Sequence, residues 1–303
     1  MTPELPADLV ASLAGLDAAV DLVSEEPMAA GTGAATRDLA RLTIDVRVPG
    51  ADVRRVVVVR KRLRPETVGR HAVGAQDPRH WAYWRREVEA YSSDLLPSGP
   101  GLRAPRCLAV EDDAVYLEEI VGDPPTVETA ARALARWQVK ASPNDDRDWI
   151  GRDQLERRVA VSTLDWTEVR NAPRMESLWA RRSELLHQLA LLPKVLSHGD
   201  FSVGNLQLVG DDVVALDWAT LGMEPVGFDL AHLALSVGVD PLPAYLATDV
   251  SALGGPEHVS DGYRASLALI GASRFHWMLS RSIEPPDWYA DLVWGQQPPG
   301  GVS

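Results

Sequence analysis

A short segment around residue 200 holds the side chains whose chemistry is most suited to catalysis. Four polar residues, His198, Asp200, Asn205 and Asp217, lie there among apolar, strand-like neighbours. A carboxylate that is removed from water costs free energy unless it is paired with, or bound to, a cation. We therefore expect these carboxylates to hold a cation beside a reacting group.

The spacing of these residues predicts how they meet. Two apolar stretches of four residues flank a Gly-Asp-Asp sequence at 210–212, which is typical of a tight turn. A hairpin there would bring Asn205 and Asp217 to the same end of two paired strands, with Asp200 on the loop that enters the hairpin. Oxygen ligands of this kind suit a hard cation such as Mg²⁺. The alternative is structural, with a capping aspartate and a hairpin asparagine.

An aspartate, an asparagine five residues later and a second aspartate also form the template of phosphoryl transfer. In that template one carboxylate positions the attacking hydroxyl, and the other two residues hold the metal. The run His-Gly-Asp-x4-Asn at 198–205, followed by Asp217-Trp218, resembles the catalytic segment of the aminoglycoside phosphotransferase family. Five positions agree with that segment at the correct spacing.

The resemblance implies both a fold and residue roles. Members of this family have a protein-kinase-like fold, which is α+β, with a small antiparallel-sheet N-lobe and a larger, mostly helical C-lobe. By resemblance, Asp200 is the catalytic base or hydroxyl positioner, and His198 supports the loop. Asn205 and Asp217 are, in the same way, the Mg²⁺ ligands.

The first lobe should supply the nucleotide contacts. Lys61 ends a valine-rich strand, where kinase-like enzymes keep a lysine that contacts phosphates and a helix glutamate. Glu87 is the preferred partner, and Glu89 is the second choice. The alternatives are a solvated basic strand end and a solvated helix face. Arginines on both sides of Lys61 also leave the strand register open.

Three weaker signals complete the expected site. Gly31 and Gly33 lie at a suitable distance before Lys61 for a phosphate-covering loop, although a plain turn is the alternative. The segment from Glu119 to Val121 lies where the lobes join, and by resemblance its backbone contacts the purine. Asp229 belongs to a Gly-Phe-Asp-Leu-Ala segment that also resembles the family, and we expect it to cap a helix.

Apolar periodicity predicts the elements of the first 121 residues. Alternating apolar residues predict a strand over 39–48, and a run of four valines predicts a second strand over 53–63, so the two form a hairpin. A second, short hairpin is expected over 106–121. Apolar residues at helical spacing predict helices over 7–20 and 80–96.

From residue 126 the pattern is helical, apart from a strand-like island over 195–218. We expect a nucleotide-binding lobe over 1–121, a hinge over 122–125 and a helical lobe over 126–303, with the ligand in the cleft between lobes. The helices of the second lobe are expected near 126–141, 151–162, 173–192, 226–238 and 257–282.

The composition narrows the classes of protein. The chain has 303 residues, of which 46% are hydrophobic and 24% charged, as in a folded globular protein. Its net charge of −13 argues against nucleic-acid binding, which needs a basic surface. One cysteine excludes a disulfide framework. Without a signal-peptide pattern or a membrane-length apolar run, we expect a cytoplasmic monomer or homodimer with no membrane partner.

These observations together predict a small-molecule kinase. We expect Mg²⁺ and ATP or GTP as cofactors, and a small molecule with a free hydroxyl as acceptor. An aminoglycoside or other aminated sugar is the first choice, because acidic and aromatic residues are mixed after residue 240. A solvated acidic surface is the alternative explanation of that segment. Choline-, homoserine- or macrolide-type acceptors, a non-catalytic nucleotide-binding protein and, less favoured, a protein kinase are the other functions that we weigh.

Overall fold

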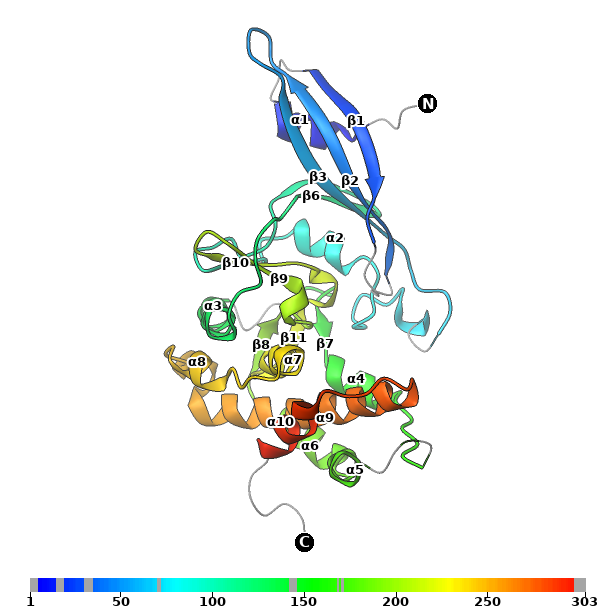
Figure 1. Cartoon of the computed structure of the whole chain (residues 1–303), viewed down its shortest axis with the longest axis vertical. Helices are drawn as coiled ribbons and strands as arrows, with labels where there is room; N and C mark the ends of the chain where they lie inside the picture. The colour runs from blue at the N-terminus through cyan, green and yellow to red at the C-terminus, as the bar shows by residue number, and fades with distance from the viewer. Residues whose placement is uncertain are drawn as a thin grey trace.

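The N-terminal part of the chain folds around a five-stranded antiparallel sheet. In this computed structural model the strands lie in the order β1-β2-β3-β6-β5. Figure 1 shows this sheet at one end of the molecule and most of the helices at the other, so the fold is α+β, as predicted. The strands are β1 (Ala19–Pro27), β2 (Thr36–Arg47), β3 (Arg54–Leu63), β5 (Cys107–Glu111) and β6 (Ala114–Glu118).

The structure describes most of the chain. The described residues are 5–14, 19–29, 35–69, 72–141, 146–167, 169 and 172–296. Within these ranges, no helix is long and apolar enough to cross a membrane.

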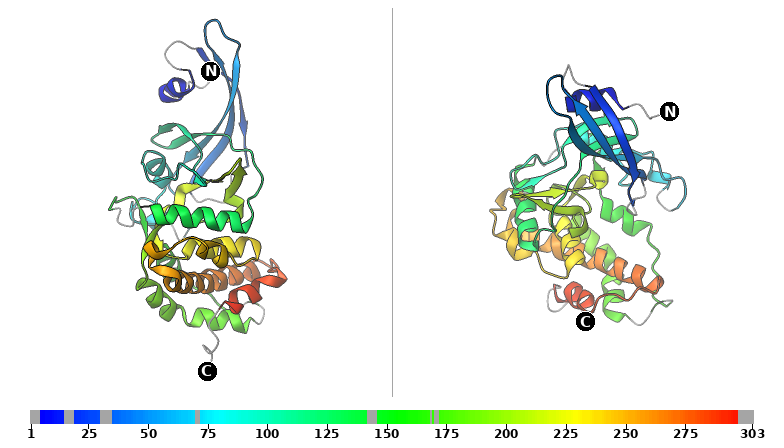
Figure 2. Two further views of the ribbon diagram at one scale, coloured as in Figure 1. Left: turned by 90° about the vertical axis from the view of Figure 1, so that its left-hand side faces the viewer. Right: turned by 45° about the horizontal axis from the view of Figure 1, so that its top comes forward.

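The two faces of the large sheet are covered by different helices. Helix α1 (Ala7–Ala14) buries its apolar residues against β2, β3 and β5, and Figure 2 shows it beside the sheet. On the other face, Val88 of α2 (Arg86–Tyr91) packs with Val115 of β6. Because side chains alternate along a strand, successive residues of β3 point toward different helices.

The predicted helix over 7–20 is wrong at its last two residues, which belong to a strand. Residues 19–27 form β1, which pairs with β2 in antiparallel orientation. Val20 and Leu22 are two residues apart, and both pack against the apolar cluster under α1. This period of two is that of a strand, and pairing with β2 also satisfies the backbone of the segment.

The predicted helix over 80–96 is reduced to α2, and the reason is Arg86. Its guanidinium is fully buried and donates hydrogen bonds to the carbonyl oxygens of Pro78, His80, Trp81 and Trp149, at 2.6 to 2.9 Å. A carbonyl that points at Arg86 does not enter a helical ladder, so the segment before α2 forms turns instead.

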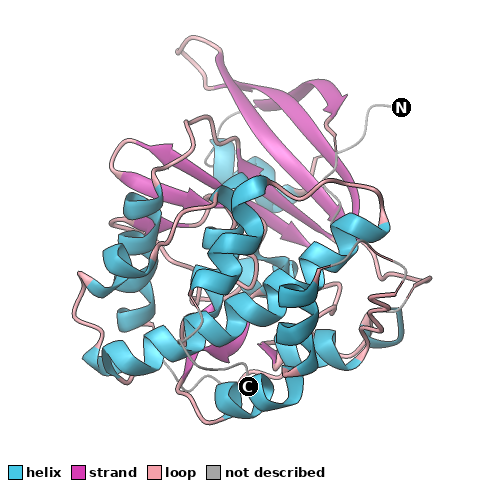
Figure 3. Cartoon of the chain, turned by 60° about the horizontal axis from the view of Figure 1, so that its bottom comes forward, coloured by secondary structure: helices cyan, strands magenta, loops and turns pink. Residues whose placement is uncertain are grey.

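The C-terminal part is built around α9 (Gly255–Ser280), which packs against α5, α6, α7 and α10. Figure 3 shows these helices gathered on the side away from the large sheet. The single helix predicted over 173–192 is divided at Arg181, and α8 and α10 were not predicted. The other helices are α3 (Val127–Lys140), α4 (Gln154–Ala160), α5 (Pro173–Ala180), α6 (Arg182–Ala190), α7 (Phe228–Val237), α8 (Leu242–Leu246) and α10 (Asp287–Gly295).

Two small sheets, with strand orders β4-β10-β9 and β7-β11-β8, carry the segment around residue 200. Strands β9 and β10 form the predicted hairpin, with Ala215 opposite Leu206. The strands are β4 (Leu102–Arg103), β7 (Gly151–Arg152), β8 (Lys194–Ser197), β9 (Leu206–Val209), β10 (Asp212–Ala215) and β11 (Gly222–Pro225). Short 3-10 helices are η1 (Ala72–Gly74), η2 (Val203–Asn205), η3 (Trp218–Thr220) and η4 (Ser251–Leu253).

The chain passes from the large sheet to the helices beside β9. Leu208 donates a backbone hydrogen bond to the carbonyl of Asp123, at 2.7 Å. A Cβ atom at Gly122 would lie 2.4 Å from the Leu208 carbonyl oxygen, so only glycine fits this close approach. The lobe boundary at 122–125 stays a prediction.

Candidate active site

Three charged side chains from distant parts of the chain meet between the large sheet and the hairpin. Lys61 Nζ lies 2.6 Å from Glu87 Oε2 and 2.8 Å from Asp217 Oδ1. Burial by itself would lower the pKa of Lys61, but the two carboxylates outweigh it and raise the pKa, so the ammonium stays charged. The structure therefore joins three residues that the sequence assigned to one site.

Strand register explains why Lys61 enters this site rather than its arginine neighbours. Lys61 on β3 is opposite Val115 on β6, and Val115 packs toward α2. Arg60 is opposite Tyr116, on the face that α1 covers. Lys61 therefore faces α2, and Glu87 on that helix is within its reach.

A cavity of about 480 Å³ adjoins this group. Its polar lining includes Lys61, Asn205 and Asp217, and apolar side chains from β2, β3 and β6 form much of the rest. The segment from Glu119 to Gly122 also lines it, and Arg41 holds the Glu119 carboxylate at 2.6 Å. Gly31 and Gly33, the expected phosphate loop, lie outside the described residues.

Asn205 lies against Asp200 at the start of the hairpin. Its Nδ2 donates to the Asp200 backbone oxygen at 3.0 Å and to Asp200 Oδ2 at 3.2 Å. The backbone of Leu216 donates to the Asn205 carbonyl at 2.8 Å, which holds the two ends of the hairpin together. With its amide nitrogen engaged, Asn205 keeps its Oδ1 atom available for a ligand in the cavity that it lines.

Asp217 combines an unusual backbone with an accessible carboxylate. Its φ of 63° lies in the left-handed region, which non-glycine residues rarely adopt and which is enriched at functional sites. Its side chain is 40% exposed, although Lys61 engages one oxygen. Among the described residues, no cluster of three or more His, Cys, Asp or Glu side chains is placed to hold a metal. A Mg²⁺ ion here would therefore combine Asp217 and Asn205 with phosphate and water oxygens, as Mg²⁺ commonly does.

His198 connects the loop to the end of β10. Its Nε2 lies 2.8 Å from the Leu216 carbonyl, so Nε2 carries a proton and Nδ1 accepts the Asp200 backbone N–H at 3.2 Å. The ring is fully buried, and this burial lowers its pKa, so His198 is neutral. A neutral, fully bonded histidine of this kind fits the supporting position that the sequence predicted.

Asp229 on α7 binds the backbone of the same loop. Contrary to our expectation, it does not cap a helix. Its carboxylate accepts the backbone N–H groups of His198 at 2.8 Å and Gly199 at 3.0 Å, and Gln138 Nε2 lies 3.3 Å away. No side-chain hydrogen bond caps α7, whose N-cap residue is Gly227. Burial raises the pKa of Asp229 to about 7, against the opposing effect of the two amides.

His232 contacts Asp200, and the sequence analysis did not identify it. His232 Nδ1 lies 3.1 Å from Asp200 Oδ1, and the histidine is 1% exposed. Burial lowers the pKa of His232 to about 4, so the ring is neutral and Nδ1 carries the proton that Asp200 accepts. The signal was its spacing: His232 follows Asp229 by three residues, which places both on the face of α7 toward the loop.

This arrangement keeps Asp200 ionised. Burial alone would raise its pKa, but the hydrogen bond from His232 and the nearby positive charge of Arg274 lower it well below the ordinary range. Its side chain remains 43% exposed. Asp200 is thus a charged, oriented and accessible carboxylate.

The fold and this group of residues define a class of protein. The chain has the protein-kinase-like fold of small-molecule kinases, with a sheet-based part, a helical part and a polar site between them. Residues 116–268, about half of the chain, match the model of the phosphotransferase enzyme family, APH. The chain therefore belongs to this family, as the resemblance implied.

Solved structures support the fold assignment. A choline kinase from Streptococcus pneumoniae is 14% identical, with a TM-score of 0.51 and coverage of 95% of this chain and 94% of that one. A macrolide 2'-phosphotransferase type I is 17% identical, with a TM-score of 0.52 and coverage of 91% and 92%. A thermostable mutant of aminoglycoside phosphotransferase APH(4)-Ia, in complex with ADP and hygromycin B, is 13% identical, with a TM-score of 0.50 and coverage of 93% and 96%. No curated protein sequence matches the chain.

Proposed function

We propose that this chain is a Mg²⁺-dependent phosphotransferase that moves the γ-phosphate of ATP or GTP to a hydroxyl group of a small molecule. The contact among Lys61, Glu87 and Asp217 carries the proposal. It brings a cation suited to phosphates and a carboxylate suited to a metal to the same wall of a cavity. Asp200 and Asn205, on the neighbouring loop, supply the other groups that phosphoryl transfer needs.

The nucleotide would occupy the cavity of about 480 Å³. We place the purine against the apolar lining and the backbone from Glu119 to Val121, and the phosphates beside Lys61. Glu87 fixes the position of the Lys61 ammonium, so the phosphates meet a preorganised charge. Gly31 and Gly33 are proposed to contribute backbone N–H groups.

The oxygen donors near this end of the cavity fit Mg²⁺. Asp217 offers a carboxylate and Asn205 an amide oxygen, both hard ligands, and neither is fully used by protein contacts. When bound, the metal would neutralise charge that develops on the phosphate oxygens.

Asp200 would orient the acceptor hydroxyl and take up its proton. Both of its oxygens are held, one by His232 and the other by Asn205, so the carboxylate has a fixed direction. Its lowered pKa keeps it ionised but makes it a weak base. Such a base accepts the proton late, after the bond to phosphorus has largely formed.

An aminated sugar such as an aminoglycoside is one candidate acceptor. The net charge of −13 favours it, because an acidic protein attracts cations. The acidic residues that suggested this acceptor give no local support. Seven acidic residues lie between 240 and 291, and six of them are exposed. None of the seven lines the second cavity of the structure, which is formed by α4, α5, α7 and α9 and includes His232. Choline-, homoserine- and macrolide-type acceptors remain alternatives.

The test is thermal melting with Mg²⁺ and ATP or GTP, combined with an assay of ADP or GDP release. We expect the nucleotide to raise the melting temperature of the wild type and of Asp200→Asn, but not of Asp217→Ala. Nucleoside diphosphate release should fall roughly 10²–10⁴-fold in Asp200→Asn. A melting shift without release for any hydroxylated acceptor would favour a non-catalytic nucleotide-binding protein. No shift with either nucleotide would contradict the proposal.

A further inference from the structure

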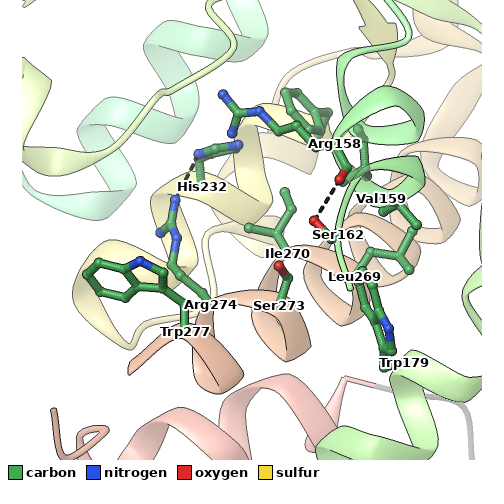
Figure 4. A pocket seen from close by; sticks show the side chains of 12 residues that line it. Arg158, Val159, Ser162, Trp179, His232, Leu269, Ile270, Ser273, Arg274 and Trp277 are labelled. Carbon is green, nitrogen blue, oxygen red and sulfur yellow. Dashed lines mark hydrogen bonds between the residues drawn. The ribbon is translucent and has the colours of Figure 1, made fainter. Parts of the chain in front are cut away.

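A second cavity, of about 330 Å³, is lined in part by His232, the residue whose Nδ1 atom contacts Asp200. It is enclosed by helices α4, α5, α7 and α9 and is drawn in Figure 4. His232 is common to the wall of this cavity and to the contact with Asp200. A molecule that fills the cavity therefore lies one side chain away from the proposed base.

The charges in this cavity have one sign. Arg158 and Arg274 line it, and no aspartate or glutamate does. Figure 4 shows His232 between the two arginines. In a chain with 43 acidic residues, a cavity with two arginines and no carboxylate differs sharply from the molecule's average charge.

Arg274 has donors that the protein does not use. Among the described residues, no carboxylate forms an ion pair with it, and its one hydrogen-bond contact is His232 Nδ1, at 3.3 Å. That nitrogen carries the proton that Asp200 accepts, so it offers Arg274 no lone pair. A half-buried guanidinium without an acceptor is stabilised when an anion binds.

His232 also has an unused atom. Its Nε2 is buried and, within the described part of the chain, has no hydrogen-bond partner. Because Nδ1 carries the proton, Nε2 is an acceptor that a hydrogen-bond donor of a bound molecule, other than the reacting hydroxyl, would satisfy. The rest of the wall is apolar and aromatic, with Trp179, Phe228 and Trp277 among its residues.

From this cavity we infer that the acceptor carries an anionic group, a carboxylate or a phosphate, together with an apolar portion. The inference rests on the proposed phosphotransferase function. The anion would pair with Arg274, the apolar portion would contact the aromatic wall, and the hydroxyl would reach past His232 to Asp200. A polycationic aminoglycoside would instead bring like charges together in this cavity.

The transfer step balances without a further reactant. The acceptor oxygen forms a bond to the γ-phosphorus while the bond from that phosphorus to the β,γ-bridging oxygen breaks. The hydroxyl proton passes to the Asp200 carboxylate and then to solvent. The products are the nucleoside diphosphate and the phosphorylated acceptor.

The inference is tested with matched hydroxylated probes that differ in charge. We would use 3-phenyllactate, its methyl ester, phenylalaninol, glycerol 3-phosphate and kanamycin, and measure calorimetric binding and Mg²⁺-ATP-dependent ADP release. At least one anionic probe should bind at least tenfold more tightly than the ester and the two amines. Preference between 3-phenyllactate and glycerol 3-phosphate separates a carboxylate from a phosphate. Tighter binding of kanamycin or phenylalaninol, or no binding of either anion, would overturn the inference.

Variants of Arg274 test the same point on the protein side. Arg274→Gln should weaken binding of the preferred anionic probe at least tenfold, and Arg274→Lys should restore part of the affinity. Arg264→Gln, ten residues earlier on α9, should have no effect. Unchanged binding in Arg274→Gln would contradict the inference. Each variant is also melted with Mg²⁺-ATP. A retained nucleotide shift shows that the variant is folded, and a missing shift in the wild type identifies failure of the proposed function itself.

Discussion

The hydrogen bond from His232 to Asp200 is the contact that most directly fixes the proposed base. It holds Oδ1, while Asn205 holds Oδ2, so the loss of either partner frees the carboxylate to rotate. A hydrogen bond to a charged group contributes about 1.5–3 kcal/mol. His232 is therefore a positioning residue, whose effect should appear in turnover rather than in nucleotide affinity.

We expect His232→Phe, which keeps a ring but has no donor, to lower kcat by roughly 10- to 100-fold, which corresponds to that hydrogen bond. The KM for ATP should stay unchanged. His232→Asn, whose Nδ2 can take the place of Nδ1, should recover part of the loss. Steady-state kinetics of the two variants, with the exposed His187→Phe as control, would check this. Equal kcat in both His232 variants would show that the donor has no positioning effect.

Residues of the site differ in how far the sequence could predict them. Asp200, Asn205 and Asp217 lie in one segment, where spacing and a single hairpin decide their meeting. Lys61 also needed the register of β3 against β6, which alternation alone does not provide. Arg274 comes from a helix distant in sequence, and its relation to the site depends on how α9 packs against α7. No local pattern contains that information.

At the scale of elements, the loop from His198 to Asp200 is held by the close approach of two backbones. Gly199 has a φ of +87°, and a Cβ atom there would lie 2.2 Å from the carbonyl oxygen of Thr220. The side chain of Thr220 in turn donates to the carbonyl of His198 at 3.0 Å. The loop and the turn after β10 therefore form one packed unit that fixes Asp200 relative to Asp217.

Gly199→Ala should separate these two segments. We expect a loss of about 2–4 kcal/mol in the free energy of unfolding, from strain at a positive φ and from the contact with Thr220. Activity should fall as well. Urea unfolding would check the change, with Gly204→Ala in the same loop as the matched control, because a Cβ atom there meets nothing within 4 Å. Similar stability of the two variants would mean that the loop backbone shifts to accommodate the added Cβ atom at little cost in free energy.

Apolar periodicity predicts the bounds of some elements correctly and of others incorrectly. Strand β2 alternates and β3 holds a run of four valines, and both were predicted within three residues at each end. Strand β1 was missed because the spacing of Val20 fits the apolar stripe of α1 and the start of a strand equally well. Helix α2 was predicted too long because the carbonyls before it turn toward Arg86, a tertiary contact. The lengths of these elements were decided by packing partners rather than by local pattern.

At the scale of the whole molecule, acidic and basic side chains are distributed unevenly. The net charge of −13 lies largely on the surface, and the cavity beside His232 is lined by arginines. The overall acidity and the local chemistry thus favour opposite kinds of acceptor. Local groups decide binding once the ligand is desolvated, because charges interact more strongly away from water.

Among the described residues, Glu224 is one of several buried acidic residues, and it should contribute to the pH dependence of stability. Glu224 on β11 accepts the Gln154 backbone N–H through Oε1, at 2.9 Å, and its Oε2 has no hydrogen-bond partner among the described residues. Burial raises its pKa from 4.5 to about 7, against the lowering effects of that amide and of Lys194. Between these two values the folded state binds more protons than the unfolded state, so stability falls as pH rises through this window.

Glu224→Gln keeps the oxygen that accepts the Gln154 amide but cannot ionise. We expect the variant and the wild type to melt at similar temperatures near pH 4.5, and the variant to become more stable by a few kcal/mol at pH 8, where wild-type Glu224 must carry a buried charge. Urea unfolding at half-unit steps from pH 4.5 to 8 would measure the difference, with the exposed Glu257→Gln as control. Asp229, whose pKa is also raised to about 7, is present in both proteins, so its contribution cancels in the comparison. Parallel curves for wild type and Glu224→Gln would show that Glu224 stays charged across the window without loss of stability.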